Sequence, residues 1–207
     1  MENKSSDLVD KNVYNYIKKD PLDNLIRKAR NFQLFEFSEF SHGNLSKIPK
    51  LQTAILTCID CRILVEKLFK LEIGEAVVIR TAGNIIDSSI LKNLIISIYG
   101  LSVNKIILLG HLDCGMTINE KEFKKIINNI YVKTGLSIEK FNEKLHNTIS
   151  FREFIGGFND PIQNIQLQLK RLYLMQQSKV IPDNVMIQGY LYNEKDGSIK
   201  HVEFEFK

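Results

Sequence analysis

Long apolar runs are missing from this sequence. No stretch approaches the roughly 20 consecutive apolar residues that a membrane-spanning helix needs. Residues 1–7 are polar and contain no apolar segment of the kind found in a secretory signal peptide. We therefore expect a cytoplasmic protein that has no membrane partner.

An excess of charge of one sign is also missing. Lysine and arginine together number 28 against 24 acidic residues, so the net charge is only +4, and no basic stripe with interleaved aromatic residues occurs. This mild charge gives no indication of nucleic-acid binding. No G-x-G-x-x-G motif follows a strand-like run, which argues against a Rossmann dinucleotide site.

Cysteine is scarce, and its few positions are concentrated. The chain has three cysteines, Cys58, Cys61 and Cys114, and all of them fall inside two short motifs, Thr57–Arg62 and Gly110–Gly115. An odd number of cysteines confined to one candidate site argues for metal or redox chemistry and against a disulfide framework.

Each motif directly follows a short apolar run, residues 53–56 and residues 105–109. These runs are rich in Ile and Leu and lack polar alternation, which is typical of strands buried on both faces. Sulfur and imidazole donors at the ends of two such strands would stand on rigid supports, and zinc favours that donor set. We therefore take Cys58, His111 and Cys114 as candidate zinc ligands, which would leave a fourth position for water.

The shared metal constrains the order of the strands. Ligands of one zinc lie roughly 4 Å apart, and neighbouring strands lie about 4.8 Å apart, so the strands before Cys58 and His111 should be adjacent. A further strand-like run at residues 76–80 lies between them in sequence, and right-handed crossovers place it on the far side of the first strand. The order 2-1-3 follows, with a topological switch point between the first and third strands.

The remaining patterns predict an α/β fold in a single domain over residues 1–207. Helical spacing at residues 9–29 predicts a helical arm over 1–40, which Pro21 should divide into two helices. The α/β core over 50–207 should contain a central, mostly parallel sheet in a three-layer-like arrangement. Its helices should cover residues 63–70, 88–100, 117–131 and a segment that begins at Pro161. A C-terminal edge hairpin should join strands at 185–192 and 199–206.

At these motifs the sequence resembles the β-class carbonic anhydrases. The resemblance rests on Cys58-x-Asp60-x-Arg62, on the stretch Val78–Asn84 and on His111-x-x-Cys114-Gly115. It implies reversible hydration of CO2 to bicarbonate by a zinc-bound hydroxide, with Cys58, His111 and Cys114 as the zinc ligands. It also implies a homodimer or a larger homo-oligomer whose site lies at the subunit interface.

The resemblance assigns roles to three further residues. Asp60 and Arg62 act as a gate in the family: the carboxylate leaves zinc open while it is bound to arginine, and it closes the site when it is released. In an extended segment both residues would face the same side as Cys58. A backbone amide near Gly83 helps to hold the substrate in the family, although this residue also suits a plain turn glycine. The apolar residues Val78, Ile85 and Ile86 are candidates for a CO2 pocket.

Cys61 leaves other readings open, because the family usually carries a small residue such as Ser or Ala at this position. Together with the three candidate ligands it could complete a closed Cys3His zinc site with no room for water. It could also form a disulfide with Cys58. Carbonyl sulfide or carbon disulfide hydrolysis on the same fold is a second enzymatic reading. A zinc-binding or redox-sensing protein without turnover is a third.

Overall fold

The computed structural model describes residues 21–31, 46–146 and 148–204. The chain divides into two units, residues 1–45 and 46–207. In the first unit, helix α2 spans Pro21–Asn31 and so begins at the proline that was predicted to separate two helices. The rest of the expected helical arm, residues 1–20 and 32–40, lies outside the described residues.

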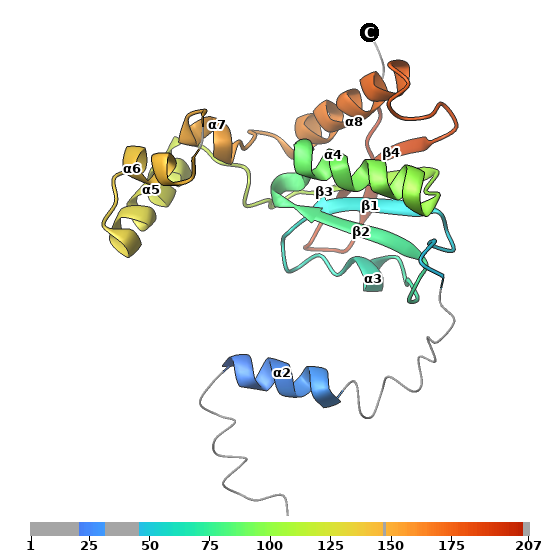
Figure 1. Cartoon of the computed structure of the whole chain (residues 1–207), viewed down its shortest axis with the longest axis horizontal. Helices are drawn as coiled ribbons and strands as arrows, with labels where there is room; N and C mark the ends of the chain where they lie inside the picture. Colours follow the sequence, from blue (N-terminus) through green and yellow to red (C-terminus); the bar gives the residue numbers. More distant parts are fainter. Residues whose placement is uncertain (1–20, 32–45, 147, 205–207) are drawn as a thin grey trace, which may run out of the picture. The chain divides into compact units, whose positions relative to one another are not determined.

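One five-stranded sheet forms the centre of the second unit, with the strand order β2-β1-β3-β4-β5 (Figure 1). The strands β1 to β4 run parallel, and β5 pairs antiparallel with β4. The strands are β1 (Thr53–Cys58), β2 (Ala76–Thr81), β3 (Lys105–His111), β4 (Met186–Tyr192) and β5 (Ile199–His201). The predicted order 2-1-3 and the C-terminal edge hairpin are confirmed, but β5 ends at His201, well before the predicted end of that strand.

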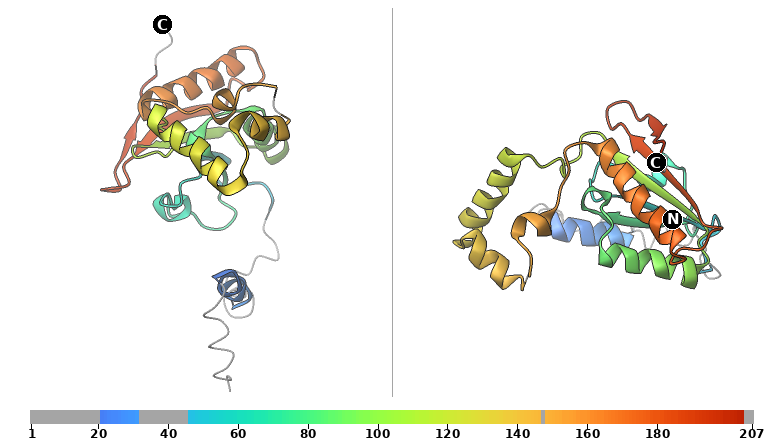
Figure 2. Two further views of the ribbon diagram at one scale, coloured as in Figure 1. Left: turned by 90° about the vertical axis from the view of Figure 1, so that its left-hand side faces the viewer. Right: turned by 90° about the horizontal axis from the view of Figure 1, so that it is seen from above.

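Helices cover both faces of this sheet. Helices α4 (Ser88–Ile95) and α8 (Pro161–Gln177) lie side by side on one face, and the short α3 (Val65–Leu68) lies on the other (Figures 1 and 2). The apolar side chains accordingly form two clusters, one beneath α4 and α8 and one beneath α3. This is the three-layer α/β arrangement that the sequence predicted.

The helix ends follow local sequence signals. The side chain of Asp87 accepts a hydrogen bond from the backbone N–H of Ile90 at the start of α4. Helix α8 begins with Pro161 after the capping residue Asp160, as predicted. The helix expected to run to Gly100 does so only with a change of geometry, because Ile96–Gly100 forms a π-helical turn, η3, after α4.

Two glycines let α8 approach the sheet closely. A Cβ atom at Gly110 would lie 2.6 Å from Cδ1 of Ile165, and one at Gly189 would lie 2.8 Å from Cδ1 of Leu169. Side chains at these positions would push the helix away from β3 and β4. Because Gly110 precedes His111, this close packing also fixes the end of β3.

Residues 119–157 form a helical excursion away from the sheet (Figure 2). It contains α5 (Glu120–Thr134), α6 (Ile138–Lys144) and α7 (Phe151–Ile155). The sequence predicted the first of these helices three residues too early. It gave no clear pattern for the other two, because α6 has no buried residue and α7 is only five residues long. Among the described helices, none is long and apolar enough to span a bilayer.

Candidate metal centre

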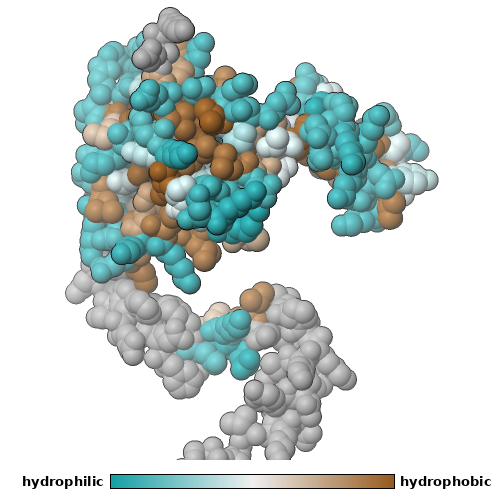
Figure 3. Space-filling model, turned by 180° about the vertical axis from the view of Figure 1, so that it is seen from behind, coloured by the Kyte–Doolittle hydropathy of each residue, from teal (hydrophilic) through white to brown (hydrophobic). Residues whose placement is uncertain are grey.

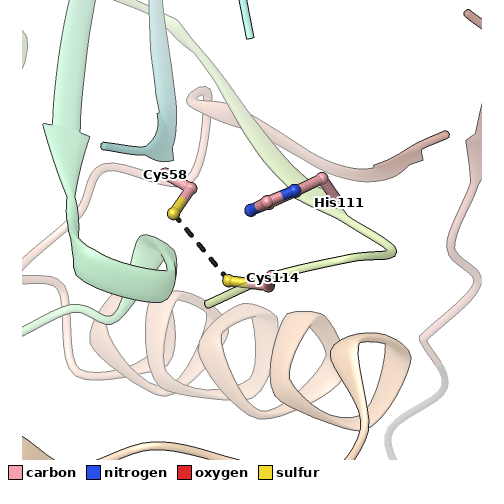
Figure 4. Close-up of side chains that lie close together, drawn as sticks. All are labelled: Cys58, His111 and Cys114. Carbon is pink, nitrogen blue, oxygen red and sulfur yellow. Dashed lines mark hydrogen bonds between the residues drawn. The ribbon is translucent and has the colours of Figure 1, made fainter. Parts of the chain in front are cut away.

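Three donor side chains meet at the carboxyl ends of β1 and β3, and we call Cys58, His111 and Cys114 the donor cluster (Figure 4). Cys58 is the last residue of β1, His111 is the last residue of β3, and Cys114 follows in the next loop. The two strands are adjacent and parallel, so their ends lie at the same edge of the sheet. All three residues are buried, and their donor atoms lie within 4.8 Å of one another.

The spacing within the donor cluster suits zinc. Two sulfurs bound to one tetrahedral zinc at about 2.3 Å each lie about 3.8 Å apart. The Sγ atoms of Cys58 and Cys114 are 3.8 Å apart, far longer than a disulfide bond. The Nε2 atom of His111 is buried and has no hydrogen-bond partner among the described residues. A soft cation between these three atoms would satisfy the buried nitrogen and both sulfurs.

The surroundings stabilise negative charge on sulfur. The backbone N–H of Gly83 donates to Sγ of Cys58 at 3.3 Å, and that of Met116 donates to Sγ of Cys114 at 3.5 Å. The hydrogen bond with Cys114 lowers the pKa of Cys58 against the opposing effect of burial, while the hydrogen bond with Cys58 and burial raise the pKa of Cys114. A cation between the sulfurs would stabilise the thiolate form of both cysteines, so that ionisation of one would no longer oppose ionisation of the other.

The second ring nitrogen of His111 contacts a carboxylate that the sequence analysis did not single out. Nδ1 lies 2.5 Å from Oε1 of Glu194, a residue in the turn between β4 and β5. Burial lowers the pKa of His111, but the nearby sulfur of Cys58 and the carboxylate of Glu194 outweigh this effect and raise it. Asp-Gly in this turn indicated a hairpin, and no local pattern indicated that the neighbouring glutamate reaches a histidine 83 residues away.

Asp60, Arg62 and Asp113 form an ionic group beside the donors, which we call the Arg62 cluster. The side chain of Arg62 donates to both carboxylate oxygens of Asp60, at 2.9 and 2.7 Å, and its backbone N–H donates to Oδ1 at 2.9 Å. It also donates to Oδ2 and the backbone carbonyl of Asp113, at 2.8 and 2.7 Å. These bonds to the Arg62 side chain lower the pKa of Asp60 to about 2.

The backbone between Cys58 and Arg62 does not stay extended, in contrast to the prediction. A turn forms at Cys61–Arg62, because the Asp60 carboxylate accepts the backbone N–H of Arg62. Cys61 is consequently exposed, is not disulfide-bonded and does not join the donor cluster. Among the described residues no third sulfur completes a closed site, so the structure supports neither the Cys3His arrangement nor the disulfide.

Gly83 lies beside the donor cluster, and its backbone N–H points at the sulfur of Cys58. It has a left-handed φ of 63°, and a Cβ there would lie 2.8 Å from Cε1 of Phe158. Both the backbone conformation and the lack of space therefore favour glycine at this position. The carbonyl of Gly83 accepts from Nδ2 of Asn164 at 2.9 Å, and the side-chain Nε2 of Gln168 donates in turn to Oδ1 of Asn164 at 3.0 Å. This buried network fixes the Gly83 amide against the sulfur of Cys58, and the role of Gly83 toward a substrate stays a prediction.

The apolar residues predicted for a CO2 pocket do not lie together. Val78 packs on the cluster beneath α3, whereas Ile86 belongs to the cluster beneath α4 and α8. Val78 lies within β2, whereas Ile86 comes after the strand and the turn that follows it, where the chain has passed to the face beneath α4 and α8. Val78 and Ile86 therefore do not line one pocket, and the role of Ile85 stays a prediction.

Comparison with known proteins gives a consistent result. A family model described as carbonic anhydrase matches residues 53–199. The β-carbonic anhydrase 1 of Mycobacterium tuberculosis is 27% identical over 161 residues, which cover 77% of this chain and 87% of that protein. The crystal structure of a β-carbonic anhydrase from Trichomonas vaginalis has a TM-score of 0.70 at 31% identity, with 90% and 100% of the two chains covered. A carbon disulfide hydrolase of Saccharolobus solfataricus is 28% identical over 161 residues, which cover 74% of this chain and 79% of that protein.

Proposed function

Because this chain belongs to the β-class carbonic anhydrase family, we propose that it catalyses the reversible hydration of CO2 to bicarbonate with zinc as its cofactor. The observation that carries the proposal is the donor cluster, whose three buried donors leave one tetrahedral position free of protein ligands among the described residues. Zinc held there supplies a Lewis acid that makes water a stronger nucleophile near neutral pH.

Cys58, His111 and Cys114 would hold the zinc. The two sulfurs carry negative charge and so reduce the effective charge of the metal, whereas the imidazole is neutral. The amides of Gly83 and Met116 moderate this effect by donating hydrogen bonds to the sulfurs. We expect the group that attacks CO2 to form at a higher pH than it would beside three histidines, so activity should rise into the alkaline range.

We propose that Asp60 and Arg62 act as a gate. In the observed arrangement both oxygens of Asp60 are engaged by Arg62, which keeps this carboxylate from serving as a fourth ligand. Arg62 has alternative partners, because it also bonds Asp113 and lies 3.8 Å from Glu194. Release of Asp60 would therefore leave the guanidinium still paired, which lowers the cost of opening and closing.

Gly83 and the oligomeric state complete the proposal. The amide region of Gly83 borders the donor cluster and would help to hold a substrate oxygen. Large apolar side chains are exposed near the motifs, including Ile59 at 62% and Leu64 at 52%, and apolar surface is visible on the core in Figure 3. We expect a homodimer or a larger homo-oligomer to cover such surface, which sedimentation would measure. The cytoplasmic location stays a prediction.

Carbon disulfide or carbonyl sulfide hydrolysis is a second candidate, favoured by the similarity to the Saccharolobus solfataricus enzyme. Both substrates are linear and apolar like CO2, and the same donor cluster would serve them. The deciding experiment is stopped-flow CO2 hydration at about pH 8.5, where the attacking group should be formed, repeated with carbonyl sulfide and carbon disulfide. Turnover of CO2 is expected. Turnover of a sulfur substrate alone would select the second candidate, and turnover of none would favour a non-catalytic zinc or redox-sensing protein.

A further inference from the structure

Glu194 is a buried carboxylate in an otherwise exposed turn. The turn between β4 and β5 is built by other residues: Asn193 and Asp196 bond each other at 2.8 Å, and Asp196 accepts the backbone N–H of Ser198 at 2.8 Å. Lys195 and Asp196 are exposed, but the side chain of Glu194 is only 7% exposed. A glutamate that is merely part of a turn would keep its charge in water, so this inward orientation calls for another explanation.

The sheet brings this glutamate to the donor cluster. Strands β3 and β4 are parallel and in register, with His111 opposite Tyr192. Glu194 therefore comes two residues beyond the partner of His111, at the same edge of the sheet. Its Oε1 atom lies 2.5 Å from Nδ1 of His111 and accepts the backbone N–H of Asp113 at 2.9 Å. One carboxylate oxygen thus joins the hairpin to the loop that carries two of the three donors.

This contact determines which nitrogen of His111 faces the sulfurs as an acceptor. A carboxylate oxygen only accepts hydrogen bonds, so Nδ1 must carry the proton. In the neutral ring Nε2 then keeps its lone pair, and this atom is the buried one without a hydrogen-bond partner among the described residues. A metal can bind only through that lone pair.

We propose that Glu194 is a positioning residue of the metal centre, which holds His111 in the tautomer and orientation that direct Nε2 toward Cys58 and Cys114. The inference rests on the zinc site of the proposed function, but not on the reaction with CO2. Carboxylates that accept from the outer nitrogen of a histidine ligand also raise its basicity, and losing them typically weakens metal binding about 10–100-fold.

The test compares Glu194→Ala and Glu194→Gln with a control in the same turn, Asp196→Ala. The control removes the bonds to Asn193 and Ser198 that stabilise the hairpin, but it does not touch His111. The full-length proteins would be compared by zinc affinity, measured in competition with a chelator, and by the visible absorption of the Co2+-loaded forms. Neither measurement requires turnover.

Glu194→Ala should weaken zinc binding about 10–100-fold and shift the Co2+ bands. Glu194→Gln should lose less zinc affinity, because its amide oxygen can still accept a hydrogen bond from Nδ1 of His111. This near-isosteric change also keeps the test valid if the alanine variant does not fold. Asp196→Ala should bind zinc within about twofold of the unmodified protein.

Zinc affinities of both Glu194 variants within twofold of the unmodified protein would overturn the proposal. An equal loss in Asp196→Ala would also overturn it, because the effect would then come from a loosened hairpin. A protein that shows the Glu194 effect but does not hydrate CO2 would instead refute the proposed function and leave this inference standing.

Discussion

The donor cluster and the Arg62 cluster lie at the same edge of the sheet but differ in burial and in how easily their side chains can change partners. Cys58, His111 and Cys114 are each at most 6% exposed and stand on or beside strand ends whose register is fixed by the core. The side chains of Arg62 and Asp113 are 45% and 72% exposed, that of Asp60 is 15% exposed, and Arg62 divides its hydrogen bonds between the two aspartates. Buried donors cannot exchange partners without disturbing the core, whereas exposed ion pairs are worth little individually and exchange easily.

The comparison suggests a division of tasks. The donor cluster should determine whether the protein binds metal, and the Arg62 cluster should determine the activity of the metal-bound protein. Substitutions in the first should therefore change metal content and activity together. Substitutions in the second should change activity alone.

The largest effect is expected for Cys58→Ser. Removing one thiolate should weaken zinc binding about 10²–10³-fold, since protein zinc sites are worth roughly 10–16 kcal/mol over four ligands. CO2 hydration should be lost in parallel, as measured by zinc titration and stopped-flow kinetics. Full zinc retention in this variant would remove Cys58 from the site.

A large effect on activity alone is expected for Asp60→Asn. The amide keeps the shape of the side chain but loses the charge that pairs with Arg62, so turnover should fall about 10²-fold while zinc content stays at the level of the unmodified protein. The matched control is Asp113→Asn, the exposed carboxylate on the other side of Arg62, which should cost less than about fivefold. Near-normal turnover in Asp60→Asn would show that Asp60 does not act as a gate.

A smaller effect, on the stability of the fold, is expected when the pH is lowered. The pKa of Asp60 is lowered to about 2 in the folded chain from an ordinary value of 3.8. Its pairing with Arg62 therefore stabilises the fold fully above about pH 4 and is lost as the pH falls through about 2. The carboxyl carbon of Asp60, followed by NMR, should titrate well below the ordinary value for aspartate, and a midpoint near 4 would show that the pair does not persist in solution.

The smallest effect is expected for Cys61→Ala. This cysteine is exposed and lies outside the donor cluster, so zinc affinity and turnover should stay within about twofold of the unmodified protein. Loss of zinc from this variant would mean that Cys61 is a fourth ligand in solution and that the site is closed.

The sequence by itself determined the candidate ligands and the centre of the sheet. Cys58 and His111 follow buried strands, and the chemistry of zinc requires such donors to be close, so the order of β2, β1 and β3 followed from local patterns and one distance. Asp87 likewise signalled a helix start through its hydrogen bond to Ile90, and Pro161 did so through its fixed φ at the first helical position. Interactions of this kind join residues that are close in sequence or follow general rules of chain geometry, so they can be predicted without coordinates.

Only the tertiary structure decided which groups surround the donors. Glu194 reaches His111 across 83 residues, and Asn164 fixes Gly83 across 81. The turn at Cys61 depends on a hydrogen bond that competes with strand geometry. Side chains that meet through the packing of separate elements leave no periodic signal in the chain, because their spacing is set by the register of the sheet and by the approach of α8 over Gly110 and Gly189.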